Sequence, residues 1–307
     1  MSLFDAFRYD GKRVVVVGGA TGIGAAAAQL AQDAGAEVVV MDFAEVTLPG
    51  VKAIRVNLAE RASIDAAVDE CGGAVDALFS CAGVADGTPG IERINFVGHR
   101  HLIDRMVSTE MLRRGSSICL VSSLGGVGWE SSLASLSKLL DIADFDAAAR
   151  WFVQRGQANY TTTKLAIGAY VARQAFPLLK RGIRINAISP GATDTPLAQA
   201  NKETWLGFGT DYRDAVGMKP FTPIEQAYPL LFLCSDAAAA ITGTIVNSDA
   251  GWLSSAITRS FPSATLFAKI LLGRSLWARL VRDVATRLSS HPRFSGRRPS
   301  FVPAGRA

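Results

Sequence analysis

The sequence predicts an α/β fold in which a doubly wound parallel sheet forms a single domain. Short runs of β-branched and other apolar residues alternate with helix-forming stretches from about residue 12 to residue 252. This alternation is typical of a parallel sheet covered by helices on both faces. No linker-like stretch interrupts it, and hydrophobic residues make up 49% of the chain, which suffices for a large core.

The first unit is a strand, a glycine-rich turn, a helix and a second strand. Residues 14–17 are four valines, residues 18–24 include Gly18, Gly22 and Gly24, and residues 25–34 are rich in alanine. Gly35 is placed to end the helix, and residues 37–42, which are apolar at 38–41, are expected to form a second buried strand. Glycines between a strand and a helix let the backbone approach a pyrophosphate at the helix N-terminus. The unit therefore predicts a Rossmann fold with a dinucleotide site.

The same alternation predicts the remaining elements. We expect strands over 51–56, 77–80, 117–121, 183–188 and 244–247, and helices over 61–70, 91–113, 159–179 and 224–233. Residues 128–157 lie between a strand and a helix and are themselves helix-like, so we expect a helical insertion there. The domain is expected to span 1–258, followed by a basic amphipathic C-terminal extension over 259–307 that is partly disordered.

Asp42 ends the second strand, 18 residues after Gly24. This is close to the offset of about 20 residues expected for an acid on the adenosine ribose. A carboxylate there accepts hydrogen bonds from the ribose hydroxyls and repels a 2′-phosphate, which favours NAD over NADP. The alternative is that Asp42 only caps the end of its strand.

Tyr160 and Lys164 are four residues apart in a helix-like segment, so both side chains share one face. That spacing alone is common, but here it occurs with the glycine turn and with Ser122-Ser123 at the end of a predicted strand. Together these features resemble the short-chain dehydrogenase/reductase family over about residues 12–252. The residues that carry the resemblance are the turn at 18–24, Cys81-Ala82-Gly83, Asn95, Ser122-Ser123, Tyr160, Lys164, Pro190-Gly191, Thr193 and Thr195.

The resemblance implies a role for each catalytic residue. Tyr160 would be the general acid/base, and Lys164 would bind the nicotinamide ribose and lower the pKa of Tyr160. Ser123 would hold the substrate oxygen, and Asn95 would support a water in a proton relay. A phenol has a pKa near 10, so acting as a base near neutral pH requires this pKa to fall by about 2–3 pH units.

The implied activity is that of an NAD-dependent oxidoreductase acting on CH–OH donors, which interconverts a secondary or aromatic alcohol and its carbonyl compound by hydride transfer. The alternative is a catalytically idle NAD(H)-binding sensor or scaffold of the same fold, against which the intact Ser123, Tyr160 and Lys164 argue. The expected NAD site comprises Gly18, Thr21, Gly22, Ile23, Gly24, Asp42, Asn57, Leu58, Cys81, Ala82, Gly83, Tyr160, Lys164, Pro190, Gly191, Thr193 and Thr195.

The insertion narrows the resemblance to a subgroup. Ser123 and Tyr160 are 37 residues apart, about two dozen more than in most family members. In this respect the chain is similar to bacterial hydroxysteroid dehydrogenases/carbonyl reductases and coniferyl-alcohol dehydrogenases, which oxidise bulky apolar alcohols. The candidate substrate contacts are Trp129, Trp205, Phe208 and Met218. The aromatic residues of the insertion, Trp129, Trp151 and Phe152, are candidates to wall a substrate pocket, and the alternative is that they form the insertion's own small core. Plain packing is the alternative for Trp205, Phe208 and Met218.

The charge is distributed unevenly. Residues 259–307 contain ten basic residues and one acidic residue, a net +9, so residues 1–258 carry the remaining −4 of the overall +5. The basic tail is expected to pack on the protein or a partner copy, with peripheral contact to an anionic membrane as the alternative. Nucleic acid is not an expected partner, because no reading module is present.

Composition excludes several further classes of protein. The four cysteines are far apart and the three histidines show no ligand spacing, so we expect neither disulfides nor a metal site. His99 and His101 are expected on a solvated helix face. We expect a cytoplasmic homo-oligomer, a dimer or tetramer, whose partner is a small apolar alcohol or ketone.

Overall fold

The computed structural model describes residues 4–265 of the chain. Its centre is a parallel sheet of seven strands, which are β1 (Arg13–Val17), β2 (Glu37–Asp42), β3 (Lys52–Arg55), β4 (Val75–Ser80), β5 (Leu112–Val121), β6 (Arg184–Pro190) and β7 (Ile245–Ser248). Their order across the sheet is β3-β2-β1-β4-β5-β6-β7. The chain therefore reverses its direction of winding between β1 and β4, the place where ligands bind in open α/β sheets.

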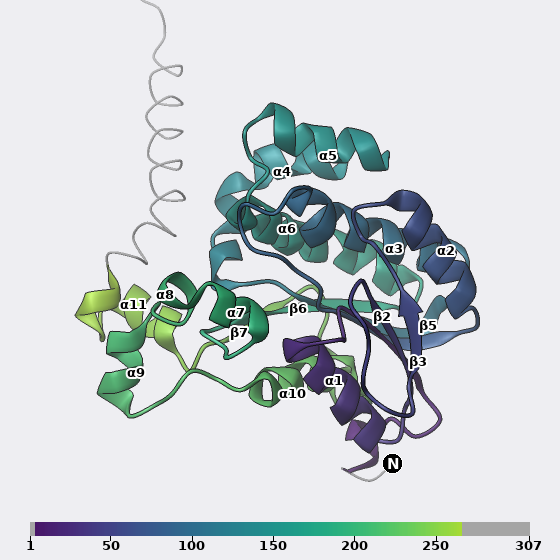
Figure 1. Cartoon of the computed structure of the whole chain (residues 1–307), viewed down its shortest axis with the longest axis horizontal. Helices are drawn as coiled ribbons and strands as arrows, with labels where there is room; N and C mark the ends of the chain where they lie inside the picture. The colour runs from purple at the N-terminus through teal and green to yellow at the C-terminus, as the bar shows by residue number, and fades with distance from the viewer. Residues whose placement is uncertain (1–3, 266–307) are drawn as a thin grey trace, which may run out of the picture.

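Helices cover both faces of this sheet. The helices that flank it are α1 (Gly22–Asp33), α2 (Arg61–Cys71), α3 (Gly98–Ser108), α6 (Tyr160–Lys180) and α10 (Pro223–Cys234). Figure 1 shows α2, α3 and α6 on one side of the sheet and α1 and α10 on the other. The predicted single-domain, doubly wound fold is confirmed.

The alternation of side chains along β1 explains why its valine run has no polar position. Val15 and Val17 belong to the core beneath α2, α3 and α6, whereas Val14 and Val16 belong to the core beneath α1 and α10. All four are fully buried. A strand buried on both faces needs apolar residues at every position, which is the pattern that the sequence shows.

The predicted helical insertion is also confirmed. It consists of the short turn η4 (Trp129–Ser132), helix α4 (Leu133–Leu140) and helix α5 (Phe145–Gln154). Figure 1 places α4 and α5 outside α6, as an additional layer on that side of the sheet. Leu139, Trp151 and Phe152 are buried in the same core as α3 and α6. The aromatic residues Trp151 and Phe152 therefore hold the insertion to the domain, and neither lines the main cavity described below.

The helix predicted over 91–113 is wrong at its C-terminal end. A π-helical turn, η2 (Arg93–Val97), leads into α3, which ends at Ser108, and β5 already begins at Leu112. The apolar residues Met111 and Leu112 continue the helical spacing, but the Met111 carbonyl accepts a hydrogen bond from Val75 N–H at 2.8 Å. Pairing with β4 therefore overrides the local helical pattern.

Short helices that we did not predict follow β6. They are α7 (Pro196–Ala200), α8 (Lys202–Trp205) and α9 (Thr210–Val216), and α11 (Trp252–Thr258) follows β7. Of the basic amphipathic extension predicted over 259–307, only residues 259–265 are among the described residues. Within residues 4–265, no helix is both long and apolar enough to cross a membrane.

Candidate active site

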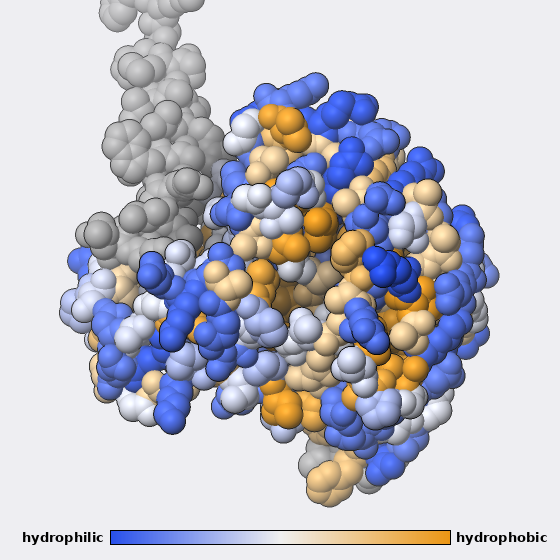
Figure 2. Space-filling model, viewed as in Figure 1, coloured by the Kyte–Doolittle hydropathy of each residue, from blue (hydrophilic) through white to orange (hydrophobic). Residues whose placement is uncertain are grey.

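A cavity of about 800 Å³ opens at the carboxyl ends of the central strands. Its walls come from the residues that follow β1, β4, β5 and β6, from the start of α6, and from the segment that contains α7 and α8. In Figure 2 apolar residues, drawn in orange, gather around the hollow in the middle of this face of the molecule. The cavity thus lies at the reversal point of the sheet.

The glycine turn forms one end of the cavity. Gly18 and Gly22 have φ angles of +82° and +58°, which a side chain would strain. A Cβ atom at Gly18 would lie 2.4 Å from Ala82 Cα, and one at Gly24 would lie 2.0 Å from the Gly18 carbonyl oxygen. The turn is therefore as tight as the sequence predicts. Its backbone, with Thr21 and Ile23, lines the cavity at the N-terminus of α1.

Asp42 lies beside this turn at the end of β2. Its Oδ2 accepts a hydrogen bond from Ala20 N–H, and its Oδ1 accepts one from Ala44 N–H, both at 2.9 Å. The carboxylate both caps the strand end and lines the cavity, so its role as a cap is compatible with a role in a binding site. Asn57 and Leu58, which follow β3, line the same end of the cavity.

The residues Cys81-Ala82-Gly83 continue from β4 against the glycine turn. The N–H groups of Cys81 and Ala82 both donate to the Val17 carbonyl, at 2.8 and 3.0 Å. All three residues line the cavity. Burial raises the pKa of the Cys81 thiol to about 12, so this cysteine stays neutral.

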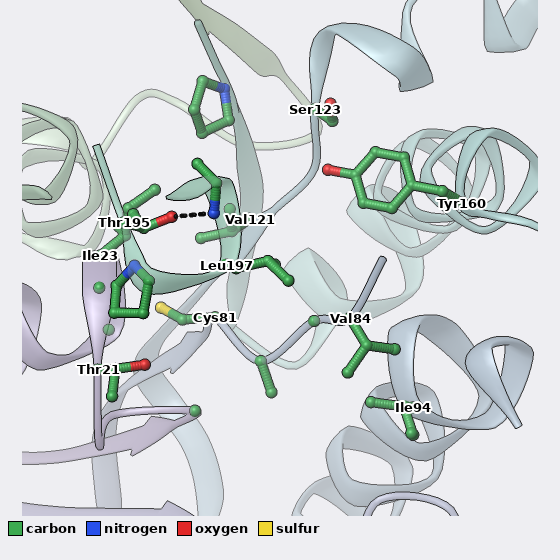
Figure 3. Close-up of a pocket in the computed structure, with 18 of the residues that line it drawn as sticks. Thr21, Ile23, Cys81, Val84, Ile94, Val121, Ser123, Tyr160, Thr195 and Leu197 are labelled. Atoms are coloured by element: carbon green, nitrogen blue, oxygen red, sulfur yellow. Dashed lines mark hydrogen bonds between the residues drawn. The ribbon is translucent and has the colours of Figure 1, made fainter. Parts of the chain in front are cut away.

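Ser123, Tyr160 and Lys164 come together at the other end of the cavity. Ser123 follows β5, and Tyr160 is the first residue of α6, where Asn159 accepts a hydrogen bond from Thr162 N–H at 2.9 Å and so starts the helix. In Figure 3 the Tyr160 hydroxyl points into the cavity with Ser123 beside it. Lys164 lies one turn further along α6, with Nζ 5.5 Å from the centre of the Tyr160 ring.

The turn after β5 lies very close to α6. The Ser122 hydroxyl donates to the Lys164 carbonyl at 3.2 Å. A Cβ atom at Gly126 would lie 2.7 Å from that same carbonyl oxygen. Glycine at this position therefore permits the approach that brings Ser123 and Tyr160 together.

The net effect of the surrounding protein is to raise the pKa of Tyr160. Burial raises this pKa, the neighbouring Ser123 opposes the rise, and the charge of Asp86 adds to it. Lys164 is buried too, and burial lowers its pKa to about 8. Its ammonium group donates to the Val121 carbonyl at 2.8 Å. That Lys164 lowers the Tyr160 pKa when a cofactor is bound stays a prediction.

Asn95 is fully buried next to the cavity and does not line it. Its Oδ1 accepts a hydrogen bond from Val84 N–H at 2.8 Å, and its Nδ2 donates to the Val84 carbonyl at 3.0 Å. A Cβ atom at Gly83 would lie 3.6 Å from both Asn95 Oδ1 and Lys164 Nζ. Asn95 thus holds the backbone beside Lys164, from within the π-helical turn η2.

The segment after β6 closes the cavity over the glycine turn. Pro190, Gly191, Thr193 and Thr195 all line it. Thr195 caps α7 by accepting a hydrogen bond from Ala198 N–H at 3.1 Å, drawn as the dashed line in Figure 3. The Thr195 methyl carbon would lie 3.3 Å from a Cβ atom at Gly22, so this segment contacts the turn directly.

Two of the four candidate substrate contacts lie in the cavity. Trp205 and Phe208 line it, and the Trp205 ring lies 4.9 Å from the Tyr160 ring, centre to centre. Met218 does not reach this cavity; it borders a much smaller one behind Phe208. Trp129 packs against α6, where its Cδ1 would lie 2.6 Å from a Cβ atom at Gly168.

Other lining residues escaped the sequence analysis because their chemistry is not distinctive. They are apolar or small residues that line the cavity walls between the motifs. Among them are Phe43, Val84, Thr88, Pro89, Ile94, Leu124, Leu197 and Thr204. Their sequence signal is only that they flank motif residues.

The histidines differ from expectation. His99 is buried and not solvated, because its Nδ1 lies 2.5 Å from Ser80 Oγ and its Nε2 lies 2.9 Å from the Ala82 carbonyl oxygen. The ring therefore bridges the end of β4 to the cavity wall. His101 is half-buried and lies 2.8 Å from Asp65. The helix face that carries His99 is thus turned into the domain.

Comparison with known protein families agrees with this geometry. The sequence model described as short chain dehydrogenase matches residues 12–134, and the one described as enoyl-(acyl carrier protein) reductase matches residues 143–253. The two matches together span the sheet and its helices, and the gap between them, residues 135–142, lies inside the helical insertion.

The matches to named relatives cover nearly the whole length of those relatives. The 2,5-dichloro-2,5-cyclohexadiene-1,4-diol dehydrogenase of Sphingobium indicum is 31% identical over 263 residues, 80% of this chain and 98% of its own. The coniferyl-alcohol dehydrogenase of Pseudomonas sp. is 28% identical over 249 residues, 78% of this chain and 96% of its own. The solved structure of the 3-alpha-hydroxysteroid dehydrogenase of Pseudomonas sp. B-0831, complexed with NADH, gives a TM-score of 0.64 at 26% identity, over 81% of this chain and 99% of that one. From its fold, its glycine turn and these matches, the chain belongs to the short-chain dehydrogenase family.

Proposed function

We propose that this chain is an NAD-dependent oxidoreductase that interconverts an apolar secondary or aromatic alcohol and its carbonyl compound. The observation that carries the proposal is the set of residues that line one cavity. A glycine turn and Asp42 line one end, and Ser123, Tyr160 and Lys164 meet at the other. The first set suits a dinucleotide, and the second suits proton transfer to a substrate oxygen.

The glycine turn fits a dinucleotide. Side chains at Gly18 or Gly24 would collide with neighbouring backbone, so the turn keeps the N-terminus of α1 open toward the cavity. Backbone N–H groups and the helix dipole there would bind a pyrophosphate. Thr195 and the N-terminus of α7 lie opposite and would bind the cofactor from the other side.

Asp42 supports NAD over NADP. Each of its oxygens already accepts one backbone hydrogen bond, and each can accept another. The ribose hydroxyls of NAD would supply these donors, whereas the 2′-phosphate of NADP would be repelled by the carboxylate. The relative whose structure is named as an NADH complex is consistent with this preference.

The proton chemistry would take place at Tyr160. In alcohol oxidation the phenolate oxygen of Tyr160 accepts the hydroxyl proton, and in carbonyl reduction the phenol returns it. Ser123 would donate a hydrogen bond to the substrate oxygen. The bound cofactor supplies the acceptor, or in the reverse direction the donor, of the hydride at the carbinol carbon. Lys164 would hold the cofactor ribose at the junction of the two ends.

The remaining walls support an uncharged, apolar substrate. Among the lining residues of the described chain, only Asp42 and Lys164 carry a charge. Trp205, Phe208 and Leu124 surround the end of the cavity near Tyr160. Aromatic and aliphatic side chains there would bind a ring-bearing alcohol by burying its apolar surface, as the names of the hydroxysteroid and coniferyl-alcohol dehydrogenases suggest for those relatives.

An NAD-coupled screen of steroids, phenylpropanoid alcohols and simple aliphatic alcohols tests the proposal. We expect the best substrate to be a ring-bearing alcohol, with NAD preferred to NADP. Tyr160→Phe should lower kcat by about 10²–10⁴-fold and leave NADH affinity nearly unchanged. Tyr228→Phe is the matched control, because Tyr228 is exposed on α10, away from the cavity. Full activity of Tyr160→Phe would overturn the mechanism.

A further inference from the structure

The first turn of α6 is capped by two side chains of different origin. Asn159 precedes the helix and accepts the Thr162 N–H at 2.9 Å. Asp86 lies 74 residues earlier in the chain and accepts the N–H of Tyr160 itself, at 2.6 Å. A carboxylate at a helix N-terminus is stabilised by the unpaired N–H groups and by the helix dipole. The second contact therefore joins a distant loop to the residue that bears the phenol.

That loop is also a wall of the cavity. It follows β4 and supplies Val84, Thr88 and Pro89 to the lining. At the start of the loop, the Asn95 side chain accepts a hydrogen bond from the Val84 N–H and donates one to the Val84 carbonyl. At its far side, Ile91 N–H donates to the Thr88 carbonyl at 3.2 Å. Asp86 lies between these two anchors, so its bond to α6 sets the distance between this wall and Tyr160.

We propose that Asp86 is a positioning residue for the alcohol–carbonyl reaction proposed above. Its carboxylate holds the first residue of α6 against the loop at 84–90. It thereby determines both the position of the Tyr160 phenol in the cavity and the electrostatic environment of the phenol oxygen. Nothing in the sequence pattern of the family motif indicates this role, because Asp86 belongs to none of its segments.

The electrostatic part of this role has a definite sign. The charged groups of the described chain near the phenol are Lys164, on the next turn of α6, and Asp86; Ser123 and Trp205 are neutral neighbours. A negative charge at Asp86 disfavours the phenolate, and it raises the pKa of Tyr160. Removing that charge without removing the oxygen acceptor should therefore let Tyr160 ionise at lower pH.

Two variants separate charge from position. Asp86→Asn keeps an oxygen that can accept the Tyr160 N–H and loses the charge, whereas Asp86→Ala loses both. Asp33→Asn is the matched control, because Asp33 is an exposed carboxylate on α1 that is bonded to Gln29, away from the cavity. Unfolding midpoints measured for all three variants show that each is folded at the assay temperature.

The first readout needs neither substrate nor cofactor. In protein labelled with fluorotyrosine, the five tyrosines give separate fluorine NMR signals, and Tyr160→Phe identifies that of Tyr160. We expect the titration midpoint of Tyr160 to fall by roughly half a pH unit in Asp86→Asn and to stay unchanged in Asp33→Asn. An unchanged midpoint in Asp86→Asn would overturn the electrostatic role, whatever reaction the enzyme catalyses.

The second readout is the pH dependence of kcat/KM for alcohol oxidation. Because oxidation needs the phenolate, the rise of activity with pH should move to lower pH in Asp86→Asn, with the maximal rate within about twofold of wild type. Asp86→Ala should lose about tenfold in kcat, because the helix start is no longer held. Wild-type profiles in both variants would overturn the positioning role. Absence of alcohol oxidation in the wild type would instead refute the proposed function and leave the NMR test standing.

Discussion

His99 should make the stability of the protein depend on pH. The ring is 2% exposed and lies between Ser80 and the Ala82 carbonyl. Burial lowers its pKa from the ordinary 6.5 to about 4. The unfolded chain therefore binds a proton at this histidine at a higher pH than the folded protein does. Stability is then fully present above pH 6.5 and falls as the pH drops from 6.5 toward 4.

The size of this effect follows from the two pKa values. Each pH unit between them corresponds to about 1.4 kcal/mol, so His99 should remove about 2 kcal/mol of unfolding free energy by pH 5 and about 3 kcal/mol by pH 4. His99→Gln has no titrating group at this position. It should cost about 1–2 kcal/mol near pH 7, because the bridge between Ser80 and Ala82 is weakened, and its stability should vary less with pH than that of the wild type.

Urea denaturation at pH 7 and pH 5 measures both quantities. We expect the advantage of wild type over His99→Gln in unfolding free energy to change by about 2 kcal/mol between pH 7 and pH 5, so that at pH 5 it has vanished or reversed. His101→Gln is the matched control, since it removes a histidine from the same helix and leaves the Ala82 carbonyl bonded; it should retain the pH dependence that His99 causes. Parallel pH curves for wild type and His99→Gln would refute the reasoning.

Three further predictions concern the cofactor site and the sheet. Asp42→Ala should narrow the preference for NAD over NADP by about tenfold or more, because the repelling carboxylate is gone; an unchanged ratio of kcat/KM values would remove Asp42 from the ribose site. Gly24→Ala places a Cβ atom 2.0 Å from the Gly18 carbonyl oxygen, so NADH affinity, followed by fluorescence titration, should fall at least tenfold; wild-type affinity would show that the turn can widen freely. Arg184 is buried and donates to the carbonyl of Leu233 in the last turn of α10 and to those of Ser235 and Ile241 beyond it. Arg184→Met should therefore cost about 3 kcal/mol of unfolding free energy in urea, and a loss below 1 kcal/mol would contradict this account of the C-terminal end of α10.

Most elements were predictable because their local patterns agree with their tertiary surroundings. The valine run of β1 and the alanines of α1 suit a strand buried on both faces and a helix packed closely on it. The helix expected over 91–113 failed at its end because Met111 and Leu112 suit either structure. Whether they become helix or strand depends on the pairing of β5 with β4, and the residues of β4 lie too far away in the sequence to appear in a local pattern.

The candidate site divides in the same way. Gly18, Gly24, Tyr160 and Lys164 are recognisable because each motif lies within a few residues of chain. Met218 and Trp129 were ambiguous because an apolar side chain carries no sign of which surface it faces.

The sequence by itself determined the α/β class, the position of the glycine turn, the helical insertion and the family. Each depends on spacing or on conformational limits that act within one short segment. Only the tertiary structure decided that His99 is buried beneath the cavity wall, that Asn95 holds Val84, and that Asp86 caps the helix of Tyr160. These contacts join residues brought together by the crossing of separate loops and helices, so their partners cannot be identified from the order of residues along the chain.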